Sequence, residues 1–311
     1  MRVIFFGTSS FAVPSLEQLV AAHHEIVMCV TRPDRPQGRG LSETPSPVKH
    51  AAVKLGLPVV QPERPQAEFF RVLQPEIGIV IAYGQLIRRD LLELPVHGMF
   101  GVHPSLLPKY RGAAPINWAL LNGEGETGLT IFRLNERLDA GEIISQRRVA
   151  IAPDECAKTL TQRLAILGGQ ELARALEAIA LSRATYTPQD AAQATFAPKL
   201  TKEQGRIDWR QPAAVIERLV RATIPWPGAT TRWQDAPLKV WRVKVDASGT
   251  SRASAAPGTV VHVTPDAVSV AAGTGAVVLQ EVQPPGRRRM PVKEFLAGHR
   301  IAVGERFEQG S

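Results

Sequence analysis

Short apolar runs alternate with amphipathic segments along the N-terminal half of the chain. Four runs have the length and composition of strands buried on both faces of a parallel sheet: Val3–Phe6, Ile26–Val30, Ile77–Ile81 and Phe100–Val102. The segments between them have helical spacing of apolar positions: Pro14–Val20, Val48–Leu55 and Gln66–Leu73. This alternation predicts an α/β fold with a doubly wound, Rossmann-like parallel sheet.

Helical periodicity becomes stronger beyond this half. Leucines at near-helical spacing predict one long helix from about Lys158 to Leu181. The polar, irregular stretch 187–205 is typical of a linker. A further helix is expected to begin near Pro212, because proline is favoured at the first helical position.

The pattern changes to period two after Pro225–Gly228. Trp241, Val243 and Val245 alternate with basic residues, and three further short strands are expected at Thr259–Val263, Ala267–Ala271 and Ala276–Val282. Short strands at this spacing predict a small barrel, for which an OB-like fold is one option. We therefore expect a catalytic domain at 1–186, a linker at 187–205 and a smaller OB-like domain at 206–311.

The charge is unevenly distributed between these parts. The 311 residues carry a net charge of +8, of which residues 187–311 supply +6 and residues 1–186 only +2. A basic domain beside a near-neutral body suggests an anionic macromolecule as partner, most simply a nucleic acid. A basic surface that only keeps the protein soluble explains the same numbers, so charge alone leaves both interpretations open.

Several classes of protein and site are disfavoured. The apolar runs are too short to span a bilayer, and the N-terminus does not resemble a signal peptide. Cys29 and Cys156 are far apart and lack metal-type spacing, which suits a reducing cytoplasm and argues against a disulfide framework or a zinc site. Neither a dinucleotide fingerprint nor a phosphate-binding P-loop motif is present.

The strongest candidate for chemistry is His103 at the end of a predicted strand. Ligands in open α/β sheets bind at the carboxyl ends of strands. Pro104 and Pro108 stiffen the loop that follows, and Asp139 lies at a glycine-marked turn further along the chain. A carboxylate that reaches a histidine can fix its tautomer and raise its basicity. Sequence position alone leaves open that His103 only binds the loop backbone and that Asp139 only forms its turn.

Two other interpretations of charged or nucleophilic residues arise here. Ser105 follows His103 closely, but no G-x-S-x-G elbow surrounds it, which argues against a nucleophilic triad. The long loop 31–47 contains three arginines that can grip phosphates, although a solvated surface loop explains them equally. The cluster Arg287-Arg288-Arg289 lies in the basic domain, which favours phosphate contact over a solvated turn.

Together these residues resemble the methionyl-tRNA formyltransferases over nearly the whole chain. The similar segments are Phe6-Gly7-Thr8, Phe11–Leu16, Thr31–Pro36, Gly38-Arg39-Gly40, Thr44–Lys49, Ala82-Tyr83-Gly84, Ser105–Ile116, Thr127-Gly128, Leu138–Gly141, Ala197–Leu200, Gly205–Trp209 and Gln283–Arg288. The linker and C-terminal segments are more specific for this family than the His103 region, which other folate-dependent formyltransferases share.

The resemblance implies formyl transfer from 10-formyltetrahydrofolate to the α-amino group of methionine on initiator tRNA. It implies catalytic roles for His103 and Asp139, with no metal. The folate site would include Tyr83, Gly84, Ser105, Leu106, Leu107 and Pro108. The tRNA contacts would include Arg35, Arg39, Lys199, Arg206, Arg287 and Arg288. A cytoplasmic monomer that does not bind membranes completes the expectation.

One position departs from the family pattern. The family uses an Asn-x-His…Asp constellation, and Gly101 stands where that Asn is expected. The Asn would donate to the formyl oxygen, and loss of one such donor typically costs about 3–4 kcal/mol. Protonated His103, a backbone N–H or a water can replace it. Otherwise the enzyme is slow, or the chemistry has shifted. The open alternatives are a 10-formyltetrahydrofolate hydrolase, an amino-sugar formyltransferase and a catalytically impaired tRNA-binding homologue.

Overall fold

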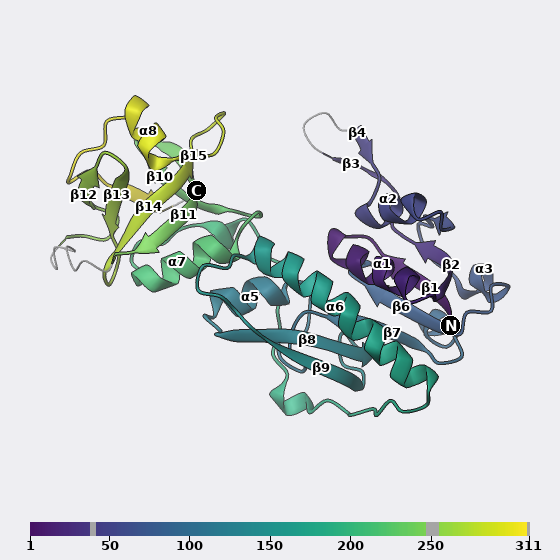
Figure 1. Cartoon of the computed structure of the whole chain (residues 1–311). Helices are drawn as coiled ribbons and strands as arrows, with labels where there is room; N and C mark the ends of the chain where they lie inside the picture. Colours follow the sequence, from purple (N-terminus) through teal and green to yellow (C-terminus); the bar gives the residue numbers. More distant parts are fainter. Residues whose placement is uncertain (38–41, 247–254, 310–311) are drawn as a thin grey trace. The chain divides into compact units, whose positions relative to one another are not determined.

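The computed structural model describes residues 1–37, 42–246 and 255–309, which form two compact units (Figure 1). The first unit comprises Met1–Pro115, Glu126–Ala150 and Thr161–Pro198. The second comprises Ile116–Gly125, Ile151–Leu160 and the chain from Lys199 onward. Each unit has its own sheet and its own hydrophobic core.

A seven-stranded sheet runs through the first unit in the order β5-β2-β1-β6-β7-β8-β9. Its strands are β1 (Arg2–Gly7), β2 (Glu25–Val30), β5 (Val59–Val60), β6 (Ile77–Ile81), β7 (Met99–His103), β8 (Glu126–Arg133) and β9 (Ile143–Ala150). The first five strands in the spatial order pair in parallel, as the apolar runs predicted. The hairpin of β8 and β9, which the sequence patterns did not predict, adds an antiparallel edge beside β7.

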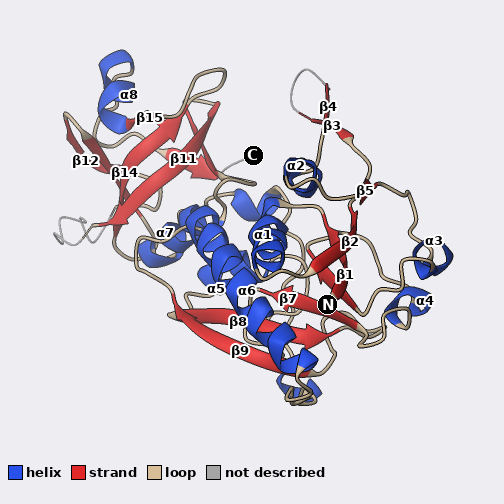
Figure 2. Cartoon of the chain, turned by 45° about the vertical axis from the view of Figure 1, so that its right-hand side comes forward, coloured by secondary structure: helices blue, strands red, loops and turns tan. Residues whose placement is uncertain are grey.

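Helices cover both faces of this sheet, which makes it doubly wound (Figure 2). The α-helices of this unit are α1 (Val13–Ala21), α2 (Pro47–Lys54), α3 (Ala67–Arg71), α4 (Arg89–Leu92) and most of α6 (Ala157–Ala180), whereas α5 (Pro115–Leu121) falls almost entirely in the second unit. Two glycines let α6 pack closely on one face: a Cβ at Gly169 would lie 2.9 Å from the Pro14 carbonyl, and one at Gly168 would lie 3.0 Å from Val102. On the opposite face, Phe70 and Leu91 pack with Phe6 in a buried apolar cluster.

The long loop expected at 31–47 contains a small hairpin. Strands β3 (Arg35–Gln37) and β4 (Ser42–Thr44) pair antiparallel on either side of the undescribed residues 38–41. Helix α2 then begins at Pro47, and the Ser46 side chain caps it by accepting a hydrogen bond from the Lys49 backbone N–H. The described parts of this segment therefore contain regular secondary structure.

The second unit is built on an antiparallel sheet in the order β12-β13-β14-β11-β10-β16, with β15 paired to β14. Its strands are β10 (Ala229–Trp233), β11 (Ala236–Val245), β12 (Val260–Thr264), β13 (Ala267–Ala271), β14 (Ala276–Gln283), β15 (Met290–Pro291) and β16 (Phe307–Gln309), and its further helices are α7 (Ala213–Ala222) and α8 (Val292–Gly298). The Val260 and Phe307 backbone N–H groups donate to Glu305 and Gly258, which joins the two edges of the sheet. This closure gives the OB-like barrel that the short strands predicted.

Within the described ranges, three short 3-10 helices complete the secondary structure: η1 (Ser10–Ala12), η2 (Ala191–Gln193) and η3 (Glu203–Gly205). Residues 187–198 belong to the first unit, where backbone hydrogen bonds and isolated bridges join them to Ile143 and Arg111. Part of the segment that was expected to be a linker is therefore hydrogen-bonded to the loop that follows His103.

Candidate active site

Strand alternation determines which side chains reach the end of β7. Val102 faces α6, so Gly101 and His103 face the other side of the sheet. Across the antiparallel pairing with β8, His103 lies opposite Thr130 and Gly101 lies opposite Phe132. His103 is the last residue of β7 and only 6% exposed. The candidate base is therefore held by a buried strand at a carboxyl end of the sheet, as expected.

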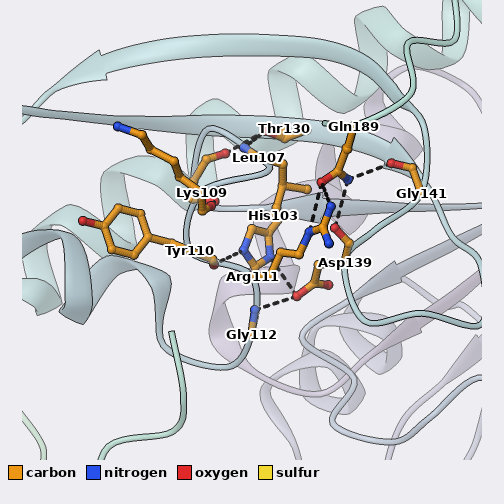
Figure 3. Close-up of polar contacts among 11 residues, drawn as sticks. His103, Leu107, Lys109, Tyr110, Arg111, Gly112, Thr130, Asp139, Gly141 and Gln189 are labelled. Atoms are coloured by element: carbon orange, nitrogen blue, oxygen red, sulfur yellow. Dashed lines mark hydrogen bonds and ion pairs between the residues drawn. The ribbon is translucent and has the colours of Figure 1, made fainter. Parts of the chain in front are cut away.

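The imidazole of His103 is oriented by the loop that follows it (Figure 3). Its Nε2 lies 2.8 Å from the carbonyl oxygen of Tyr110. Because a carbonyl oxygen can only accept, this hydrogen bond assigns the proton of the neutral ring to Nε2. Nδ1 then carries the free lone pair. The sequence-based hypothesis gave Asp139 the task of fixing the tautomer, but the Tyr110 carbonyl performs it.

Asp139 lies beside the other ring nitrogen. Its Oδ2 is 3.7 Å from His103 Nδ1 and accepts a 2.8 Å hydrogen bond from the backbone N–H of Gly112. The backbone of Asp139 has a φ of +49°, a left-handed conformation that aspartate tolerates better than most residues. The structure thus brings the two predicted catalytic residues together, with the carboxylate placed to stabilise a protonated imidazole.

Burial and charge act in opposite directions on His103. Burial lowers the pKa of His103 below its ordinary value of 6.5, while the Asp139 carboxylate and the Tyr110 carbonyl act to raise it. The lowered pKa keeps the ring neutral, and Nδ1 available as a base, at physiological pH.

The loop from Ser105 to Pro108 is held by a network on its inner side. Thr130 Oγ1 donates to the Ser105 carbonyl and accepts from the Leu107 backbone N–H. Gln146 Nε2 donates to both the Leu107 carbonyl and Thr130 Oγ1. Ser105 is fully buried, and its hydroxyl donates to the Lys109 carbonyl. Its hydroxyl is therefore a structural group, which agrees with the absence of a G-x-S-x-G elbow around Ser105.

The folate-site residues predicted after β6 occupy two environments. Tyr83 is 2% exposed, and its ring packs edge-on against Phe6 in the core. Burial raises the pKa of Tyr83 to about 12. Gly84 is exposed and has a φ of +80°, and Thr8 Oγ1 donates to the Tyr83 carbonyl. The backbone at Tyr83-Gly84, rather than the phenol, is therefore what this segment presents at the strand end.

The place of the family Asn is filled by an aromatic ring. A Cβ built on Gly101 would lie 2.8 Å from Phe132 Cε1 and 3.1 Å from Leu134 Cδ1. The ring of Phe132 also lies edge-on to His103, with centroids 6.4 Å apart. The space beside His103 at this position is therefore apolar, and no amide can enter it unless Phe132 moves.

The predicted tRNA contacts are distributed over both units. Arg39 lies outside the described residues, and only the backbone of Arg35 is described, in β3. The other four predicted residues belong to the second unit and are exposed: Lys199, Arg206, Arg287 and Arg288. Arg288 forms an ion pair with Glu294, so part of its charge is neutralised within the unit.

Sequence reasoning missed the polar side chains that support the site. Thr130 and Gln146 come from β8 and β9, which were not predicted as strands. Gln189 lies in the segment expected to be a linker, yet it hydrogen-bonds to Asp139, Gly141 and Arg111. A half-buried glutamine among exposed neighbours has no recognisable sequence motif. Among the described residues, no three His, Cys, Asp or Glu side chains gather in a way that could hold a metal ion.

The chain is similar to known formyl transferases in both of its parts. A sequence family described as formyl transferase matches residues 1–176, and one described as formyl transferase, C-terminal domain, matches residues 199–300. A methionyl-tRNA formyltransferase of Roseiflexus sp. (strain RS-1) is 45% identical, and the alignment covers 100% of this chain and 96% of the relative. A methionyl-tRNA formyltransferase of Moorella thermoacetica is 46% identical, with 98% of each chain covered.

Solved structures with the same fold are more distant in sequence. An N-formyltransferase from Helicobacter canadensis, in complex with folinic acid and dTDP-3-aminofucose, has a TM-score of 0.69 and 16% identity, covering 91% of this chain and 99% of that one. HypX from Aquifex aeolicus, in complex with tetrahydrofolic acid, has a TM-score of 0.65 and 18% identity, covering 98% of this chain and 50% of that one. At these identities the likeness shows a shared fold.

Proposed function

The chain belongs to the methionyl-tRNA formyltransferase family, and we propose that it transfers the formyl group of 10-formyltetrahydrofolate to the α-amino group of methionyl initiator tRNA. The observation that carries the proposal is the 45% identity with the Roseiflexus relative, over 100% of this chain and 96% of that one. The pairing of His103 with Asp139 supplies a site with the acid–base chemistry that this reaction needs.

His103 acts as the base in this proposal. The attacking amine must lose a proton, and Nδ1 carries the lone pair because Nε2 is engaged with the Tyr110 carbonyl. When Nδ1 takes the proton, directly or through one water, the ring becomes positively charged. Asp139 Oδ2 at 3.7 Å stabilises that charge, and its hydrogen bond from Gly112 keeps the carboxylate in place.

The residues near His103 are compatible with a flat folate ring. The amine attacks the formyl carbon of the folate, and negative charge develops on the formyl oxygen. The bond from this carbon to folate N10 then breaks, and the proton taken up by His103 passes to the leaving nitrogen. The exposed backbone of Gly84, the half-buried Leu106 and the 79% exposed Leu86 offer polar edges and apolar surface near the strand ends. Leu107 is buried, and the proline after it stiffens the loop backbone. No side chain at position 101 donates to the oxygen, so protonated His103, a backbone N–H or a water must serve.

The basic second unit is assigned to the tRNA. Lys199, Arg206, Arg287 and Arg288 are exposed there and suit phosphate contacts, with Arg35 and Arg39 contributing from the first unit. In this proposal the catalytic, linker and tRNA-binding parts span residues 1–186, 187–205 and 206–311. A cytoplasmic location and a monomeric state complete the proposal. Within the part of the chain that the structure describes, no helix is long and apolar enough to cross a membrane.

Gly101 keeps hydrolysis of the formyl donor as a second candidate activity. Because position 101 offers no amide to the formyl oxygen, a water that takes the place of the acceptor amine can attack the formyl carbon instead. An amino-sugar acceptor is disfavoured because a small acceptor does not need a basic second domain. A tRNA-binding homologue without catalysis is disfavoured by the retained geometry of His103 and Asp139.

An acceptor comparison tests the proposal. Formyl transfer from 10-formyltetrahydrofolate is measured with methionyl initiator tRNA, methionyl elongator tRNA or a nucleotide-linked amino sugar, and deformylation of the donor is followed without any acceptor. We expect product on the initiator tRNA, at a rate well above donor deformylation. If the donor is deformylated and no acceptor accelerates the reaction, the chain is a hydrolase and the proposed transferase activity is wrong.

The first prediction concerns pH. Burial lowers the pKa of His103, and the ring is a base only above that pKa, so activity is lost only when the pH falls through the lowered value. At saturating tRNA and folate, so that titration of the free acceptor amine does not enter the profile, we expect the acidic limb of kcat to lie below pH 6.5, the ordinary histidine value. The measurement is a pH–rate profile with methionyl initiator tRNA. A limb at or above pH 6.5 would contradict the assignment of a buried neutral base.

The second prediction concerns the arginine-rich loop. Replacing Arg39→Ala removes one phosphate-binding charge, which is expected to raise the KM for tRNA about 10-fold, at constant KM for the folate. The exposed Arg71 of α3 provides a matched control, since Arg71→Ala removes the same charge elsewhere on the first unit. An equal KM for tRNA in the native, Arg71→Ala and Arg39→Ala proteins would show that the loop is not part of the tRNA site.

A further inference from the structure

Gln189 is turned inward from an exposed stretch of chain. Most residues from Leu181 to Gln193 are exposed, whereas Gln189 is half-buried and reaches the site loops (Figure 3). Its backbone neighbours are fixed as well, because Thr187 pairs with Ile143 and the Thr195 carbonyl accepts from Arg111. The side chain therefore leaves a well-anchored segment, which makes its position a property of the fold.

Every hydrogen-bonding capacity of the Gln189 amide is used. Nε2 donates to the carbonyl oxygen of Asp139 at 2.9 Å and to that of Gly141 at 2.7 Å. Oε1 accepts from Arg111 Nε at 3.1 Å and from Nη2 at 2.7 Å. The amide has two donor hydrogens and two acceptor lone pairs, so all four are satisfied. A glutamate side chain, which has the same size, would still accept from Arg111 but could not donate to the carbonyl oxygens of Asp139 and Gly141.

These contacts close a ring around the catalytic carboxylate. Gln189 binds the backbone of Asp139 on one side and the side chain of Arg111 on the other. Gly112, the residue after Arg111, donates its backbone N–H to Asp139 Oδ2. The ring thus fixes both the left-handed backbone of Asp139 and the donor that orients its carboxylate. The 3.7 Å separation between Asp139 Oδ2 and His103 Nδ1 follows from these two constraints.

We infer that Gln189 is a positioning residue for the formyl transfer, which acts through Asp139 and touches neither substrate. The inference rests on the proposed function. Loss of the amide frees the Asp139 turn, and misplacement of a catalytic group by about 1 Å can cost about 100-fold in rate. Since the defect lies in placing the carboxylate, it affects turnover and leaves the binding of both substrates unchanged.

The kinetic test uses Gln189→Ala and Gln189→Glu, with Gln193→Ala as the matched control. Gln193 is an exposed glutamine four residues further along, and its amide donates to the Asp190 side chain, away from Asp139 and Arg111. We expect kcat to fall about 10- to 100-fold for both Gln189 variants, with each KM within about 2-fold of native. The control keeps native kcat. Native-like turnover of Gln189→Glu would reduce the role of Gln189 to filling space and would overturn the inference.

A double-mutant cycle separates positioning from general support of the fold. If Gln189 acts only through the Asp139 carboxylate, Gln189→Ala should cost less than about 3-fold in an Asp139→Asn background. The same fold-loss in both backgrounds would mean that Gln189 acts independently of Asp139, which contradicts the inference.

A readout without catalysis distinguishes failure of the inference from failure of the proposed function. The imidazole of His103 is titrated by NMR in the native, Gln189→Ala and Asp139→Asn proteins, with His103→Gln used for assignment. Because the Asp139 carboxylate acts to raise the pKa of His103, displacing it should lower that pKa in both variants. An unchanged or raised pKa in Gln189→Ala would overturn the inference, whatever acceptor the enzyme uses.

Discussion

Replacing Asp139→Asn is expected to lower kcat for formyl transfer about 1,000-fold. A unit positive charge on His103 lies 3.7 Å from Asp139 Oδ2, and at an effective dielectric of about 20 such a pair is worth about 4 kcal/mol. The asparagine keeps an oxygen for the Gly112 N–H but loses the charge that stabilises the protonated ring. The measurement is single-turnover formyl transfer to methionyl initiator tRNA.

The control for this variant is Asp154→Asn, which neutralises an exposed aspartate of the chain. We expect native kcat and an unchanged melting temperature for the control, and an unchanged melting temperature for Asp139→Asn within a few degrees. Turnover of Asp139→Asn within about 3-fold of native would reject the assigned role of this carboxylate.

The second large effect concerns the missing amide at position 101. A donor aimed at the developing negative charge is typically worth about 100- to 1,000-fold in rate. Gly101→Asn alone cannot place it, because the new Cβ would lie 2.8 Å from the ring of Phe132. The double variant Gly101→Asn with Phe132→Leu shortens the opposing side chain and makes room. We expect the double variant to raise kcat about 100-fold above Phe132→Leu, and Gly101→Asn alone to gain much less.

The comparison among these variants separates the explanations for Gly101. A full gain from Gly101→Asn alone would show that the Phe132 ring yields freely and does not exclude the amide. No gain in the double variant would mean that the group serving the formyl oxygen in the native chain is already as effective as the amide. Single-turnover rates at a pH where His103 is neutral keep the base constant across the set.

The strands and helices with strong periodicity were predictable from the sequence. The central strands are buried on both faces, so their apolar runs are continuous, and the long helix α6 occupies 157–180 against an expected 158–181. Strands β8 and β9 were missed although they form the edge beside His103. In β9 only Val149 is buried, so its polar sequence lacks the apolar signal that identified the central strands.

The catalytic pair was predictable because His103 ends a predicted strand and Asp139 lies at a marked turn. The electrostatics of this pair were not predictable, because they depend on contacts between segments that are distant in sequence. The tautomer of His103 is set by a backbone carbonyl seven residues away, and Asp139 is held by a glutamine 50 residues further along the chain. A glycine at position 101 in the sequence likewise does not show that the Phe132 ring fills the space where its side chain would be. The contact between Gly101 and Phe132 follows from the pairing of β7 with β8.

The most direct test of the account is single-turnover formyl transfer from 10-formyltetrahydrofolate to methionyl initiator tRNA by the native chain and by His103→Gln. His103 supplies the base, so the account predicts transfer by the native protein and a loss of about 100- to 10,000-fold in the variant. Both proteins should bind tRNA equally. Native-like transfer by His103→Gln, or no transfer by the native chain to this acceptor, would contradict the central claim.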